Sequence, residues 1–150
     1  MALFQPITNI YICQGIPLDN RYINTITWEN IDNQVSYYKS KAIINYPESS
    51  YQRIERYTDI KATAESLVNA NYIIFQNANY GNKWYFAFIV SVEYVAEQMS
   101  RVRFEIDAWQ TYYFDISIKP SFVSREHTNN DAIGANTVPE GLELGPYVTT

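Results

Sequence analysis

Apolar and polar residues alternate along much of the chain, and this pattern predicts a mainly β fold. The clearest case is "RVRFEIDA" at residues 101–108. One face of this segment is apolar and the other charged: Val102, Phe104, Ile106 and Ala108 against Arg101, Arg103, Glu105 and Asp107. A period of two residues is typical of a half-buried antiparallel strand.

Similar patterns predict further strands, and turn residues separate them. The expected strands cover residues 7–13, 35–46, 51–57, 72–76, 83–95 and 121–126. Gly15 and Pro17 end the first strand, and Pro47 ends the second. The polar, Asn-rich stretch 18–34 is expected to be a long connection, and "AEQMS" at 96–100 a turn.

One segment has the spacing of a short helix. In "DIKATAESLVNA" at 59–70, Asp59 can cap a helix whose apolar positions recur at i, i+4, i+7 and i+8. These positions are Ile60, Ala64, Leu67 and Val68. The pattern at 109–116, "WQTYYFDI", fits either a helical stripe or a continued strand.

The segment 83–94 is unusual because both faces of the predicted strand are apolar near its start. One face carries Trp84, Phe86, Phe88, Val90, Val92 and Tyr94, and the other carries Tyr85, Ala87, Ile89, Ser91 and Glu93. At about 3.3 Å per residue such a strand spans roughly 40 Å. Both faces need cover from the helix, a second sheet or another subunit, which favours a head-to-tail ring of copies.

The loop before this strand, "NANYGNKW" at 77–84, could be a phosphate cradle or a hairpin turn. A phosphate cradle needs several glycines between a strand and a helix N-terminus. Here a single glycine, Gly81, precedes Lys83, and a strand follows. Asn and Gly tolerate positive φ angles, so we expect a hairpin turn.

Composition and charge argue against a nucleic-acid-gripping protein. The 150 residues are 47% hydrophobic and 18% charged, with 14 tyrosines, a net charge of −5 and a pI of about 4.8. Phosphate contacts need clustered Lys and Arg. The nearest pair, Arg101 and Arg103, is interleaved with acidic residues. We see no signal peptide and no apolar run long enough to span a membrane.

The residue types needed for catalysis or metal binding do not form a convincing set. Cys13 lies in an apolar strand pattern, where a buried structural thiol is expected. His127 is the one histidine, beside Glu126 and near Asp131, which is too little for a metal centre. Asp107 and Asp115 are the best candidate acid pair, but alternation places Asp107 on a charged surface. We therefore expect no catalytic residues, no cofactor and no metal.

Together these patterns predict a mainly β, antiparallel barrel- or sandwich-like domain with long hairpins and one short helix. Residues 1–127 are expected to form this β-rich domain. Residues 128–150 read as a loop-like extension that continues into a missing C-terminal part, because "YVTT" has β propensity and no following partner.

Several exact stretches resemble one viral family. "YIIFQNANYGNKWYFAF" at 72–88, "FEIDAWQTYYFDI" at 104–116, "SFVSREH" at 121–127 and "EGL" at 140–142 are similar to tail knob, or major tail, proteins of small short-tailed phages of the Picovirinae/Salasmaviridae group. A weaker similarity occurs at "NQVSYYKSK", residues 33–41. The resemblance covers the chain from about residue 20 onward.

The resemblance implies a structural virion protein rather than an enzyme. The resemblance further implies a six-fold tube below the collar and connector proteins, with the β-rich domain of residues 1–127 as a tube domain that forms its wall. Genomic DNA is then expected to pass through the lumen into the host without specific binding. Family members are several-fold longer than this chain, and their membrane-contacting loops lie in regions absent here. The alternative from the residues alone is a β-sandwich receptor- or cell-wall-binding module.

Overall fold

The computed structural model describes residues 8–50, 54–78, 81–117, 119–120 and 132. The chain divides into two compact units after Ile116. All helices and strands described below belong to the first unit. The predicted strand 121–126 and the boundary proposed at 127/128 lie outside the described residues.

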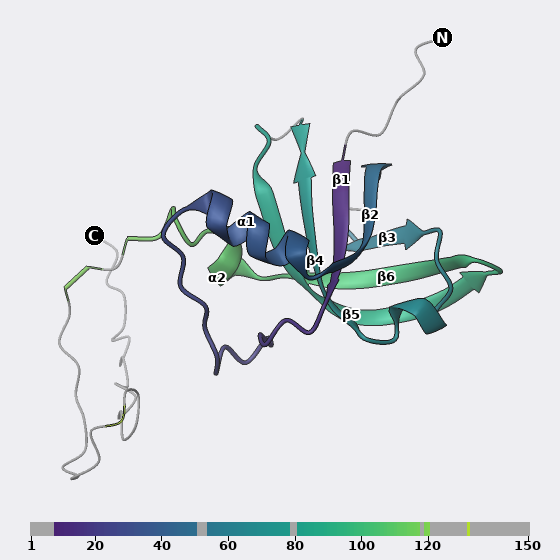
Figure 1. The fold of residues 1–150 in the computed structure, drawn as a ribbon, viewed down its shortest axis with the longest axis horizontal. Coiled ribbons are helices and arrows are strands. Elements are labelled where there is room, and N and C mark those ends of the chain that lie inside the picture. The colour runs from purple at the N-terminus through teal and green to yellow at the C-terminus, as the bar shows by residue number, and fades with distance from the viewer. Residues whose placement is uncertain (1–7, 51–53, 79–80, 118, 121–131, 133–150) are drawn as a thin grey trace, which may run out of the picture. The chain divides into compact units, whose positions relative to one another are not determined.

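The first unit is a single six-stranded antiparallel sheet with short helices (Figure 1). The strands follow the order β2-β1-β4-β5-β6-β3. Their bounds are β1 Thr8–Gln14, β2 Ala42–Ser49, β3 Tyr57–Ile60, β4 Ala70–Asn77, β5 Trp84–Ala96 and β6 Met99–Ile106. The predicted mainly β antiparallel fold is confirmed. The sheet curls into a half-barrel, and side-chain hydrogen bonds bridge its two edges: Thr58 Oγ1 donates to Ser50 O at 2.9 Å, and Tyr46 OH to Lys61 O at 2.6 Å.

The helices are not where the sequence pattern placed one. Helix α1, Ile31–Ser40, overlaps the predicted connection and the start of the strand predicted at 35–46. That strand prediction was wrong for residues 35–40 and is confirmed from Ala42, where β2 begins. Asn30 starts α1, because its side chain accepts a hydrogen bond from the Asn33 N–H. The buried stripe consists of Gln34, Val35 and Tyr38, and Lys39 lies in the last turn near the negative end of the helix dipole.

The predicted helix at 59–70 was also wrong. Residues 57–60 are β3, only Glu65–Leu67 form a 3₁₀ turn (η1), and Ala70 begins β4. Ile60 and Leu67 are both buried, but they lie in different elements that face one core. Asp59 does not cap a helix, since its carboxylate binds Arg101. Residues 54–56, predicted as extended, form a turn.

Two smaller corrections concern strand ends. Pro47, expected to end its strand, lies within β2, an edge strand whose pairing with β1 is irregular near this residue. The ambiguous segment at 109–116 begins as a helix, because α2 spans Ala108–Thr111. Among the described helices, none is long and apolar enough to cross a membrane.

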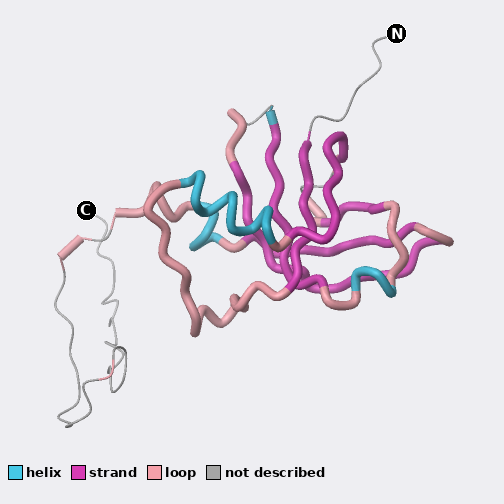
Figure 2. The backbone as a smooth tube through the Cα atoms, viewed as in Figure 1, coloured by secondary structure: helices cyan, strands magenta, loops and turns pink. Residues whose placement is uncertain are grey.

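The sheet has two cores, one on each face. On the concave face, side chains from all six strands and η1 pack together, including Ile12, Phe75, Ala87 and Phe104. On the other face, α1 and the connection between β1 and α1 cover Tyr72, Phe86 and Phe88. Figure 2 shows this connection as a long loop between the end of β1 and the start of α1. The prediction that β5 needs cover on both faces is confirmed for its first half.

The predicted face pattern of β5 changes at Val90. β5 pairs with β6 through Ile89↔Phe104 and then Ser91↔Arg103, so Val90 is an extra residue in a bulge. Val90 is exposed, and Val92 packs against the concave core together with Ile89. The prediction that Val92 shares a face with Phe86 was therefore wrong, because a bulge reverses the alternation beyond it.

Candidate functional site

A buried polar cluster joins helix α2 to helix α1 and to the connection between β1 and α1. Gln110, on α2, is 2% exposed, and its Oε1 accepts three hydrogen bonds. The donors are Trp28 Nε1 at 2.7 Å, Gln34 Nε2 at 3.0 Å and Tyr38 OH at 3.1 Å. These side chains come from the β1–α1 connection and from α1. One glutamine thus joins α2 to two adjacent segments that lie more than 70 residues earlier in the sequence.

Asp107 begins α2 and is buried, whereas alternation placed it on a charged surface. Its carboxylate accepts hydrogen bonds from Gln110 N at 3.0 Å and from Tyr72 OH at 2.8 Å. The Tyr22 phenol interacts with the same carboxyl group. Desolvation by burial raises the pKa of Asp107, and the hydrogen bonds that it accepts oppose that rise. The surface prediction was wrong because β6 ends at Ile106, so residue 107 is a helix cap.

The raised pKa of Asp107 predicts a characteristic dependence of stability on pH. A carboxyl whose pKa is higher in the folded than in the unfolded protein, where it is about 3.9, favours folding in its protonated form. Its contribution is therefore present at low pH and is lost as pH rises through the folded pKa. We expect the wild type to lose free energy of unfolding relative to Asp107→Asn as pH rises across that window. Urea unfolding from pH 3 to pH 7 measures this change.

Asp59→Asn is the matched control for this measurement. The hydrogen bond from Arg101 lowers the pKa of Asp59, so its contribution is lost as pH falls. The two variants should therefore change the pH profile in opposite directions. Parallel profiles for Asp107→Asn and Asp59→Asn would contradict the assignment of Asp107 as a desolvated carboxyl.

The β4–β5 hairpin has the turn predicted from its Asn and Gly residues. Strand pairing runs up to Gln76↔Trp84, and φ is +67° at Gly81 and +57° at Asn82. Gln76 Nε2 donates to Asn82 O at 2.7 Å and closes the turn. Lys83 binds the Asp115 carboxylate and lies over the Tyr112 ring, so it is engaged within the fold.

A β-branched residue at position 81 should destabilise the hairpin. The space around Gly81 is open, so the cost comes from the left-handed backbone alone. We expect Gly81→Val to lower the free energy of unfolding by about 1–2 kcal/mol, as measured by chemical denaturation. Gly81→Asn is the control, because Asn adopts this conformation at smaller cost. Equal stability of the two variants would show that Gly81 does not need its positive φ.

The remaining candidates for chemistry do not converge on one place. Cys13 is fully buried, its Sγ donates to Tyr38 O at 3.2 Å, and burial raises its pKa to about 12. Such a thiol is a poor nucleophile. Asp115 pairs with Lys83, so Asp107 and Asp115 have different partners. His127, Glu126 and Asp131 lie outside the described residues, and the described ones hold no group of three potential metal ligands.

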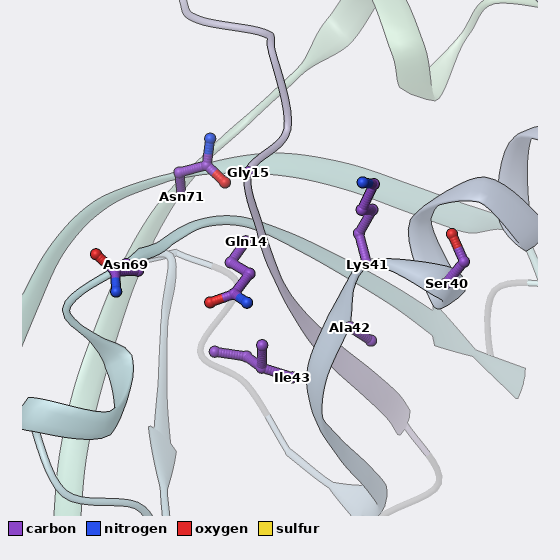
Figure 3. Close-up of a pocket in the computed structure, with 8 residues that line it drawn as sticks. All are labelled: Gln14, Gly15, Ser40, Lys41, Ala42, Ile43, Asn69 and Asn71. Carbon is purple, nitrogen blue, oxygen red and sulfur yellow. The ribbon is translucent and has the colours of Figure 1, made fainter.

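A hollow lies where β1 ends and β2 and β4 begin (Figure 3). It measures about 660 Å³ and is lined by Gln14, Gly15, Ser40, Lys41, Ala42, Ile43, Asn69 and Asn71. Asn71 has a structural role here, since its amide donates to Ile16 O at 2.7 Å and accepts from Ile16 N at 3.2 Å. The lining contains no acid, histidine or cysteine, so it offers no acid–base pair for catalysis.

The sequence interpretation missed the Gln110 cluster. Gln34 and Gln110 are polar residues on buried helix stripes, and such positions are indistinguishable from surface residues in a hydrophobicity pattern. Recognising Asn30 as the cap of a helix at 31–40 was the signal that could have found the cluster. Such a helix places Gln34 and Tyr38 on one face, close to Trp28. The cluster positions elements of the fold; it does not present reactive groups to solvent.

Comparison with known proteins gives a consistent result. The family described as "Caudoviral major tail protein N-terminus" matches residues 6–118. The tail knob protein gp9 of Bacillus phage PZA is 37% identical over 147 residues, and that of Bacillus phage phi29 is 35% identical. Each match covers 92% of this chain and 24% of the relative, so the chain spans about a quarter of the length of these curated relatives.

A solved structure shares the fold. The tail knob protein gp12 of bacteriophage C1 superposes with a TM-score of 0.57 at 17% identity, covering 71% of this chain and 22% of that one. The stretches that carried the resemblance in sequence, residues 72–88 and 104–116, form the β4–β5 hairpin, the end of β6 and α2. The chain therefore belongs to the caudoviral major tail protein family, matches its N-terminal part, and is a structural protein of the virion tail.

Proposed function

We propose that this chain forms part of the wall of a ring-shaped tail knob, with six copies around a lumen through which genomic DNA is ejected into the host. The observation that carries the proposal is the family match over residues 6–118, which includes the whole curled sheet. The neighbours in the virion would be the lower collar and connector proteins. Contacts with membrane are assigned to parts of the relatives that this chain does not span.

The arrangement of charges supports a wall that lets DNA pass without binding it. The net charge is −5, and Arg21, Lys83, Arg101 and Arg103 each pair with a carboxylate. Lys39 lies over the rings of Tyr11 and Trp84. Cations engaged in this way are less available for phosphates, and tight contacts to phosphates would oppose sliding.

DNA binding can be tested directly. We expect fluorescence anisotropy with a labelled 30-base-pair duplex to give a dissociation constant weaker than about 10⁻⁴ M at 100 mM salt. Tight, salt-sensitive binding would contradict a passive lumen.

The ring can be tested by negative-stain electron microscopy of the purified chain. Rings with a central hole support the tube wall. Isolated globules that bind cell-wall glycans would instead support a receptor- or cell-wall-binding module. We further propose that residues 1–127 suffice for the wall and that 128–150 form an extension, so a chain truncated after residue 127 should give the same rings.

A further inference from the structure

The long connection between β1 and α1 has a middle section at residues 19–25, which we call the lid (Figure 2). Ile16 and Leu18, before the lid, are buried, and Ile26 and Trp28, after it, pack against the same core. Between these two anchored ends, residues 20–25 are all exposed. The lid is therefore the part of the connection that packs least against the rest of the fold.

The hydrogen bonds of the lid are mainly internal. The Asp19 carboxylate accepts from Arg21 N at 3.0 Å and from Arg21 Nη2 at 2.8 Å, and Tyr22 N donates to Asp19 O at 3.2 Å. Among the described residues, the Tyr22 side chain makes the one polar contact between the lid and the rest of the fold. A segment without backbone bonds to its neighbours opens at a lower free energy than a strand or helix. The lid can therefore move as a unit.

Tyr22 holds the lid against the sheet and α2. Its ring lies 6.0 Å from that of Phe88 in an edge-on arrangement, and its phenol interacts with the Asp107 carboxyl and with the backbone of Ala108. Burial raises the pKa of this phenol, and the charge of Asp107 adds to the rise. The polar end of the side chain thus points into the fold, although Tyr22 as a whole is 44% exposed.

The backbone of Tyr22 is strained in this position. Its φ is +55°, in the left-handed region that bulky side chains rarely adopt. Such a conformation costs free energy and persists only where surrounding contacts impose it. Because the contacts with Phe88 and Asp107 come from one side chain, losing them lets the backbone relax and the lid move away.

The group beneath Tyr22 is a buried carboxyl. Asp107 is 1% exposed. It is faced by Tyr22 from the lid, Tyr72 from β4, Tyr38 from α1 and backbone N–H groups of α2. Glu105 of β6 adds a negative charge near Tyr22. None of these groups is a cation, so an ionised Asp107 finds no counter-ion among them and gains hydration when the lid opens.

The ionisation of Asp107 is therefore coupled to the position of the lid. Burial raises the pKa of Asp107 in the closed form, and hydration in the open form returns it toward its usual value of about 3.9. The protonated carboxyl favours the closed lid, and opening increases as pH rises through the pKa of the closed form. The cap of α2 does not require the lid, because Gln110 N donates to the same carboxylate from within α2.

We propose that residues 19–25 are a pH-sensitive lid, which Tyr22 closes over Asp107 and Phe88 when Asp107 is protonated and which opens when Asp107 ionises. Opening exposes Phe88, which belongs to the aromatic core on the α1 face of the sheet. The contacts involved lie within one copy of the chain, so the inference is independent of the proposed ring.

Hydroxyl-radical footprinting of the full 150-residue chain tests the lid, because it oxidises aromatic side chains according to their exposure. Tandem mass spectrometry then measures each residue. Phe88 reports on the lid, since it is 7% exposed beneath Tyr22, whereas Phe86 is fully buried against Tyr38 of α1 and reports on wider unfolding. The exposed Phe114 normalises the dose. We expect oxidation of Phe88 to rise at least twofold between pH 4 and pH 8, with Phe86 unchanged.

Two variants test the two parts of the lid. Asp107→Asn keeps an acceptor for Gln110 N but cannot ionise, so oxidation of Phe88 should remain at the low-pH level of the parent at every pH. Tyr22→Ala removes the contacts that hold the lid and should raise oxidation of Phe88 at least twofold at pH 4. Ile23→Ala is the matched control, because Ile23 is a neighbouring lid residue that is 70% exposed, and it should behave as the parent.

Each remaining outcome overturns the lid and leaves the ring untouched. Oxidation of Phe88 that does not change with pH in the parent, or that rises equally in Asp107→Asn, would contradict control by Asp107. A parallel rise at Phe86 would mean that the core opens instead of the lid. Equal oxidation of Phe88 in Tyr22→Ala and Ile23→Ala would show that Tyr22 does not hold the lid closed.

Discussion

Replacing Phe86 with alanine is expected to lower the free energy of unfolding by about 3–5 kcal/mol. Phe86 is fully buried on the α1 face of β5, where its ring lies 5.1 Å from that of Tyr38. Its backbone is also fixed, since Phe86 N and O both bond the Thr111 hydroxyl. A sheet strand held in this way cannot collapse around a cavity. Urea unfolding followed by circular dichroism measures the loss.

Phe114→Ala is the matched control, because it removes the same ring from a residue that is 46% exposed. We expect its effect to stay below about 1 kcal/mol. Equal losses for Phe86→Ala and Phe114→Ala would mean that the α1 face of β5 is not a packed core.

Gln110→Leu is expected to cost about 2–5 kcal/mol of stability. The substitution keeps the side-chain volume but removes the acceptor shared by Trp28 Nε1 and Tyr38 OH, and each buried donor left without a partner costs about 1–3 kcal/mol. Because Trp28 lies in the connection between β1 and α1, that segment should loosen first. Hydrogen exchange should therefore accelerate at residues 15–30 more than in the β5–β6 hairpin.

Gln14→Leu controls for the change of side chain, since Gln14 is exposed. It should leave both stability and exchange within experimental error. Unchanged exchange at residues 15–30 in Gln110→Leu would show that the glutamine does not hold the connection.

The sequence predicted the strands whose side chains alternate without interruption. β4, β6 and the β4–β5 hairpin follow directly from such alternation and from Gly81 and Asn82 at the turn. The two-sided burial of β5 was also predictable, because apolar residues occur on both faces of 84–89. These features depend on local pattern alone.

The features that the sequence did not predict depend mainly on contacts between residues that are distant in sequence. Helix α1 was missed because its buried stripe contains Gln34, whose Nε2 donates to Gln110 across 76 residues. A helix was wrongly predicted at 59–70 because the spacing of Ile60 and Leu67 fits one helix face. The two side chains instead pack into the same core from β3 and η1. The bulge at Val90 and the burial of Asp107 leave no signal in a hydrophobicity pattern, since they arise from register and from where a strand ends.

We propose that this chain is a subunit of a closed ring. Native mass spectrometry of the purified chain tests it most directly, because it counts copies without assuming a shape. We predict one dominant species of six times the 17.5 kDa chain mass, with no series of open intermediates. A monomer that persists at all concentrations, or an unbounded series of oligomers, would contradict the claim.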